Sequence, residues 1–288
     1  MKHSNSIKGI IFILLAAFGF SLMTFFVRIS GDLPTMQKAF FRNAIALVVA
    51  FAILLRSHEK FVIGKGNRLD MFCRCFAGTL GLLANFYAID HLGIADANML
   101  NKLSPFFAIL LSIIILKEIP NQFDIFTTII AFIGALFIIR PSGNFSAVLP
   151  ALLGLFGGFG AGTAYVFVRK MGKNGVKAPV IVMCFSLFSC LLTLPYLITN
   201  YVPMTAYQWG CLLMAGIAAS LGQFSITNAY KYAPAKDISV FDYTQVIFAA
   251  LLGIFFLGEV PVSLSIVGYA IIICVAIIRW NKNRKVDF

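Results

Sequence analysis

The sequence predicts an all-α integral membrane protein with ten transmembrane helices, arranged as two inverted five-helix repeats. Two observations lead to this fold class: long apolar runs dominate the chain, and its second half repeats its first. Of the 288 residues, 60% are hydrophobic and 12% are charged, and the mean hydropathy is +0.92. A soluble domain carries about 25% charged residues, so this composition indicates a chain solvated by lipid.

The two halves of the chain match at a constant offset of 141 residues, the difference between 259 and 118. This offset aligns Glu118 with Glu259, each at the end of an apolar run. It also aligns other pairs of identical residues: Gly19 with Gly160, Arg28 with Arg169, Gly81 with Gly222, Ala88 with Ala229 and Asp96 with Asp237. One offset over most of a half-chain is the signature of a duplicated unit. We therefore expect one repeat over residues 1–145 and a second over residues 146–288.

Each repeat contains five apolar runs near the ~20 residues needed to cross a bilayer. In the first repeat they predict helices over residues 9–27, 34–55, 71–89, 97–116 and 123–139. In the second repeat we expect helices to begin near residues 148, 179, 207, 238 and 264. The first run is too long for a signal-peptide core and lacks a small-residue cleavage pattern, so it is expected to remain as a helix.

The basic residues predict that both termini are cytoplasmic. In that orientation 18 of the 23 Lys and Arg residues, Arg74 among them, fall in cytoplasmic segments, as the positive-inside rule requires. The other five are Arg28, Lys38, Arg42, Lys102 and Arg140. Five spans per repeat is an odd number, so the second repeat enters the membrane from the opposite face. The net charge of +12 then indicates loops that face anionic lipid, not a nucleic-acid surface.

Inverted repeats are typical of alternating-access transporters, whose substrate sites lie near the bilayer midplane at the repeat interface. We therefore expect a multi-pass protein of the cytoplasmic membrane. Its expected partners are the lipid bilayer and a small-molecule substrate, with no nucleic acid, and it is expected to be a monomer or homodimer. We expect no cofactor, because the six Cys residues show neither a disulfide framework nor a zinc pattern.

Two other function classes are less well supported by the sequence. A membrane-embedded enzyme would need a catalytic constellation, but the chain has no HExxH, paired intramembrane Asp or Ser/Lys dyad, and its three His residues lie in loops or at the terminus. A channel would need a repeated filter or a ring of charges. We therefore expect no catalytic and no metal-binding residues.

Several motifs resemble those of the EamA-type ten-helix transporters in the drug/metabolite transporter superfamily. They are Phe40-Phe41-Arg42, Phe86-Tyr87-Ala88-Ile89, Leu103-Ser104-Pro105 and Lys117-Glu118. In the second half, Phe241-Asp242-Tyr243-Thr244 and Gly253 before Gly258-Glu259 are similar to the branch that includes S-adenosylmethionine carriers. The resemblance implies a helical bundle around a central cavity. One departure is that Val246 stands where Pro105 stands in the first half, so we expect the two halves to hinge differently.

Candidate substrate-binding residues lie on the expected helix over residues 97–116. Asn98, Asn101 and Lys102 have the spacing of one helix face. Lys102 would lie ~8–10 Å below the outer surface, where a charge usually faces the bundle interior or water, although a lysine there can also extend to the headgroups. Arg42 is expected at similar depth, either facing the cavity or bonding to a neighbouring helix end.

The second repeat supplies further candidates. Asp242 is expected about one turn into its helix from the cytoplasmic side, beside Tyr243 and on the same face as Gln245. Such a carboxylate binds a cationic group or carries a proton; the alternative is a helix-start carboxylate stabilised by the helix dipole. The other polar candidates with helical spacing are Ser220, Gln223, Thr227 and Tyr230. Tyr165 follows the glycine ladder at residues 154, 158 and 162 and is the last candidate.

These candidates predict the chemistry of the substrate. Cations in the outer half of the bundle, with Asp242 nearer the cytoplasm, predict a small organic metabolite that is amino-acid-like or carboxylate-bearing. A nucleoside-like or S-adenosylmethionine-type metabolite is the alternative.

Reporter fusions test the predicted topology. Fusions after Lys65 and at Phe288 should both report a cytoplasmic location, because the positive-inside rule places both segments there. A periplasmic signal from either fusion would contradict the ten-span arrangement.

Overall fold

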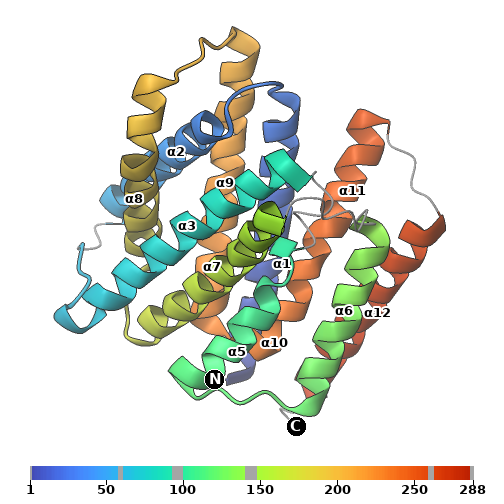
Figure 1. The fold of residues 1–288 in the computed structure, drawn as a ribbon. Helices are drawn as coiled ribbons and strands as arrows, with labels where there is room; N and C mark the ends of the chain where they lie inside the picture. Colours follow the sequence, from blue (N-terminus) through green and yellow to red (C-terminus); the bar gives the residue numbers. More distant parts are fainter. Residues whose placement is uncertain (1, 58–60, 93–99, 140–147, 259–262, 286–288) are drawn as a thin grey trace.

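The computed structural model describes residues 2–57, 61–92, 100–139, 148–258 and 263–285, and within them it is a bundle of helices without β-strands (Figure 1). The first repeat contains α1 (Lys2–Ile29), α2 (Thr35–Arg56), η1 (Lys65–Asn67), α3 (Arg68–Leu92), α5 (Ser104–Leu116) and α6 (Gln122–Ile139). The second contains α7 (Val148–Lys173), α8 (Ala178–Thr199), α9 (Ala206–Tyr232), α10 (Ala235–Ile238), η2 (Ser239–Tyr243), α11 (Thr244–Leu257) and α12 (Ser263–Lys285). The repeat boundary expected at residues 145 and 146 lies outside the described residues.

The helices confirm the predicted fold class. Counting α10, η2 and α11 as one span, the described residues form the ten helical segments that the apolar runs predict. Six of these segments are long and apolar enough to cross a membrane by length and composition, and α5 and most of α6 are shorter apolar helices. Figure 1 shows that α1 begins and α12 ends at the same end of the bundle, as an even number of spans requires.

Apolar and polar side chains are distributed as lipid solvation requires. Large apolar side chains point outward, and Ile114 and Phe255 are each 75% exposed. The interior instead contains many alanines and polar side chains, including Gln37, Ser186 and Ser189, each with no exposed surface. With lipid on the outside, close packing of small residues holds such helices together.

Glycine contacts show the duplication in three dimensions. A Cβ on Gly19 of α1 would lie 2.7 Å from the Gly222 nitrogen of α9, and a Cβ on Gly160 of α7 would lie 2.7 Å from the Gly81 Cα of α3. The 141-residue offset aligns Gly19 with Gly160 and Gly81 with Gly222. The α1–α9 contact is therefore the counterpart of the α7–α3 contact. Both contacts join the first repeat to the second.

Two of the expected helices are interrupted in the middle of the bundle. The helix expected over residues 97–116 is broken by a turn at residues 102 and 103, after which α5 starts with Pro105 in its first turn. Proline fits there because the first-turn N–H groups have no partner in the helix. The prediction of a continuous helix from residue 238 is wrong, because one turn of α10 leads into the 3₁₀ segment η2 and then into α11.

The two interruptions occupy equivalent positions, since the offset aligns residue 102 with residue 243. They differ in form, a turn before Pro105 in the first repeat and a 3₁₀ segment without proline in the second. The turn at residues 102 and 103 ends the regular helix that Asn101 and Lys102 were expected to share, and Asn98 lies outside the described residues. Interrupted helices at membrane depth occur where the backbone is buried in protein or lines a cavity.

A glycine substitution tests the close packing of α1 on α9. Gly19→Ala should destabilise the purified protein by about 1–3 kcal/mol, because the added methyl group would collide with backbone and neither helix can move locally. Gly210→Ala in α9 is the matched control, since a Cβ there meets nothing within 4 Å. Thermal melting in detergent measures both, and equal stability of the two variants would contradict this packing.

Candidate functional site

An ion pair joins the two interrupted helices at the centre of the bundle. The Lys102 ammonium lies 3.1 Å from Oδ2 of Asp242 and donates a hydrogen bond of 2.7 Å to Oε1 of Gln245. The side chains of Lys102 and Asp242 are only 9% and 8% exposed. Each charge therefore has its counter-charge in the other repeat, in a place where an unpaired charge would be costly.

Tyr243 makes a second contact between the same two segments. Its hydroxyl donates to the carbonyl oxygen of Lys102 at 3.1 Å. Because the offset aligns Lys102 with Tyr243, this contact joins equivalent positions of the two repeats and lies close to the axis that relates them. Helices α5 and α11 begin two residues after Lys102 and Asp242, respectively. The positive ends of both helix dipoles therefore lie close to the Lys102–Asp242 ion pair.

The structure corrects the expected depths of these residues. Asp242 was expected nearer the cytoplasm than Lys102, but the two side chains are in contact. The thirteen residues of α5 and the fourteen of α11 each extend ~20 Å from the interruption toward opposite membrane faces. The alternative in which Lys102 extends to the headgroups does not fit a buried, ion-paired lysine. Asn101 lies half-buried beside this pair, and Asn98 lies outside the described residues.

Two further cations are buried nearby. Arg42 of α2 is 3% exposed, and its Nε and Nη1 have no hydrogen-bond partner among the described residues. Arg74 of α3 is 2% exposed and donates from Nη2 to Oε1 of Gln223 in α9 at 3.2 Å. The Arg74 guanidinium also packs over the ring of Phe185, 4.2 Å from its centroid, while its Nε has no hydrogen-bond partner in the described part of the chain.

Arg74 was not among the predicted site residues, because it follows a basic loop and was assigned to a cytoplasmic segment. The structure instead starts α3 at Arg68 and buries Arg74 in the second turn. Gly78, one turn later, gives the side chain its space, since a Cβ there would collide with Nη1 of Arg74. An arginine within an apolar run, followed by glycine at i+4, was the available signal.

Tyr165 of α7 packs against α9. Its ring stacks on Tyr230 of α9, with centroids 4.8 Å apart and planes at 15°.

The polar stripe expected on α9 is buried, as its spacing predicted. Its members Ser220, Gln223, Thr227 and Tyr230 are between 0% and 8% exposed. Gln223 contacts Arg74, and the hydroxyl of Thr227 has no hydrogen-bond partner among the described residues. This stripe forms one wall of the central polar region.

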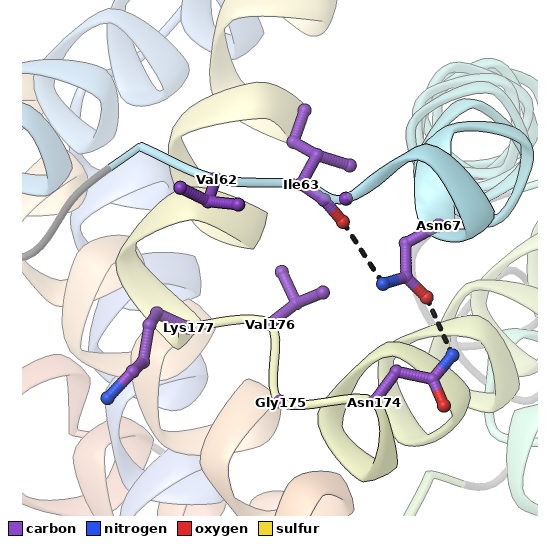
Figure 2. A pocket seen from close by; sticks show the side chains of 8 residues that line it. Val62, Ile63, Asn67, Asn174, Gly175, Val176 and Lys177 are labelled. Carbon is purple, nitrogen blue, oxygen red and sulfur yellow. Dashed lines mark hydrogen bonds between the residues drawn. The ribbon is translucent and has the colours of Figure 1, made fainter.

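A separate pocket of about 390 Å³ lies between two loops and contains none of the predicted site residues. Figure 2 shows Asn67, which precedes α3, accepting a hydrogen bond of 2.6 Å from Nδ2 of Asn174, which follows α7. Asn67 in turn donates to the carbonyl oxygen of Ile63. The pocket is thus part of a contact between the two repeats at one end of the bundle.

Several known proteins with similar sequences are named as transporters or exporters. The pseudopaline exporter of Pseudomonas aeruginosa is 32% identical over 280 residues, which cover 96% of this chain and 98% of the relative. The riboflavin transporter of Vibrio cholerae is 27% identical, over 99% of this chain and 97% of the relative. One crystal structure has the same fold, with a TM-score of 0.83 over 99% of both chains at 16% identity.

The sequence model of the EamA-like transporter family matches residues 7–140 and residues 148–279, once for each half of the chain. Both matches together span nearly all of the described helices. The chain belongs to the EamA-like transporter family, within the drug/metabolite transporter superfamily.

Proposed function

We propose that the protein is a secondary carrier that moves a small organic metabolite across the cytoplasmic membrane by alternating access. The observation that carries this proposal is the ion pair between Lys102 and Asp242, which joins the interrupted helices at the interface of two inverted repeats. Substrate sites of inverted-repeat carriers lie at this place, between broken helices near the midplane. The named activities of the relatives, an exporter and a transporter, support the same function class.

Ionic contacts join the two repeats at one end of the bundle. Oε1 of Glu118, just after α5, lies 3.2 Å from Nε of Arg169 and 2.5 Å from Nζ of Lys173, both in α7. Arg169 also donates to the carbonyl oxygen of Lys231 at 2.9 Å. The Glu118 side chain is 12% exposed, so these contacts are largely shielded from solvent.

Two more ion pairs lie at this end. Asp70 of α3 lies 2.9 Å from the Lys170 ammonium, and Asp124 of α6 lies 2.5 Å from Nη1 of Arg279. All of these pairs connect the first repeat with the second. By the proposed topology this end faces the cytoplasm, so inward opening would require these pairs to separate.

Side-chain amides join the repeats at the opposite end. Gln37 of α2 exchanges two hydrogen bonds with the backbone of Val202, at 2.8 and 2.9 Å, and Gln208 donates to the carbonyl oxygen of Ser30 at 3.2 Å. Rocking of one repeat against the other would break one set of contacts while it forms the other. The presence of contacts between the repeats at both ends supports this exchange as the transport movement.

The central residues support an amino-acid-like or carboxylate-bearing substrate. Asp242 and Gln245 already bind an ammonium group, that of Lys102. A substrate amine would compete with Lys102 for the same two acceptors, and release of Lys102 would loosen the contact between the repeats. A carboxylate on the substrate would meet the remaining positive charge, which lies on α2 and α3.

Flux measurements separate a carrier from a channel. The purified protein in liposomes should take up labelled amino acids or small carboxylates with saturation, and unlabelled substrate inside should accelerate this uptake by counterflow. Flux that rises linearly with concentration and shows no counterflow would contradict the alternating-access proposal.

A double-mutant cycle tests the central ion pair. Lys102→Met and Asp242→Asn should each destabilise the protein by about 3–5 kcal/mol, because each leaves the other charge buried without its partner. The double variant should regain most of this stability but not the wild-type transport rate. Thermal melting and liposome flux on the four proteins measure both effects, and single variants as stable as the wild type would refute a paired, buried arrangement.

A further inference from the structure

Arg42 and Arg74 carry positive charge in the bundle interior that no described carboxylate balances. The described carboxylates in ion pairs are Asp70, Glu118, Asp124 and Asp242, and each is paired with a lysine or an arginine other than these two. In the described part of the central region, the carboxylate of Asp242 is paired with Lys102. The positive charges of Arg42 and Arg74 therefore have no counter-charge among the described residues.

A structural role does not account for these two arginines. Arg169 illustrates such a role, because it pairs with Glu118 and donates to backbone carbonyl oxygens at the end of α9. In contrast, Nε and Nη1 of Arg42 and Nε of Arg74 bind no described residue, although both side chains are at least 97% buried. Buried polar groups are nearly always hydrogen-bonded. A bound ligand can therefore supply the partners that these nitrogens lack among the described residues.

The surroundings hold the two guanidinium groups in one region. Gln223 of α9 and the ring of Phe185 in α8 fix Arg74, and α2, which carries Arg42, packs on the same two helices. A guanidinium is planar, keeps its charge when buried and matches the geometry of a carboxylate. An anion bound here would balance both charges and satisfy the unpartnered nitrogens together.

We propose that Arg42 and Arg74 form an anion site that binds a ligand with two carboxylate groups. Its negative charges would match the two uncompensated positive charges, while Lys102 stays with Asp242. This inference rests on the proposed carrier function, since it assigns the class of substrate, a dicarboxylate, to the same central region.

Binding to the purified full-length protein in detergent tests the site without any transport. The probes are malonate, succinate and glutarate, with butyrate as the monocarboxylate control and phosphate as a compact dianion, all at constant ionic strength. A dicarboxylate should raise the melting temperature with saturation, at a concentration at least tenfold lower than butyrate needs. No saturable shift with any dicarboxylate, or a lower half-saturating concentration for phosphate than for all three, would overturn the assignment.

Matched variants on the same two helices locate the site. Arg42→Gln and Arg74→Gln should each weaken dicarboxylate binding at least tenfold. Arg56→Gln on α2 and Arg68→Gln on α3 should not change it, because both of these arginines are exposed at helix ends. If a glutamine variant does not fold, Arg42→Lys or Arg74→Lys replaces it, since lysine keeps the charge but loses the planar donor group.

Equal dicarboxylate affinity in the wild type and in folded variants of both arginines would overturn the site. This result is distinct from a failure of the carrier proposal, which would appear as absent saturation and counterflow in liposomes. A protein that shows counterflow of an amino acid but binds no dicarboxylate would be a carrier without this site.

Discussion

The cost of placing charge inside a membrane protein determines how the centre of this bundle is built. Lys102 and Asp242 come from opposite repeats, and each lies two residues before the N-terminus of a half-helix. The dipole of α11 stabilises the Asp242 carboxylate, whereas the dipole of α5 disfavours the Lys102 ammonium. Lys102 therefore depends on Asp242 and Gln245, which the second repeat provides. This dependence ties the interrupted helices together and makes their separation an event that a competing ligand can favour.

Polar contacts join the two repeats at both ends of the bundle. Glu118 pairs with Arg169 at one end, and hydrogen bonds of Gln37 and Gln208 connect the repeats at the other. Between the ends, close glycine contacts such as Gly19 with Gly222 keep α1 and α9 together. The movement that we propose would preserve these glycine contacts while it exchanges the contacts at the two ends, as rocking of inverted repeats requires.

Much of the fold could be predicted from sequence, because lipid solvation imposes a long apolar run on each span and duplication repeats it at one offset. The interruptions could not be predicted in the same way, since Pro105 fits equally well inside a kinked helix and the 3₁₀ segment η2 has no proline. The predicted depths of Lys102 and Asp242 were wrong because the prediction assumed continuous helices. Arg74 was missed because its nearness to a basic loop outweighed its place in an apolar run, and only tertiary packing on Gln223 shows that it faces inward.

Distances across the two ends of the bundle test the central claim, the exchange of contacts between repeats, most directly. Spin labels at Leu69 and Lys177 would report the end held by Glu118, and labels at Asp32 and Tyr201 would report the other end. All four residues are exposed. In Glu118→Gln the first distance should lengthen and the second should shorten, because the loss of charge-assisted hydrogen bonds worth about 1.5–3 kcal/mol favours the opposite conformation. Two distances that stay unchanged in Glu118→Gln, or that lengthen together, would contradict alternating access in this protein.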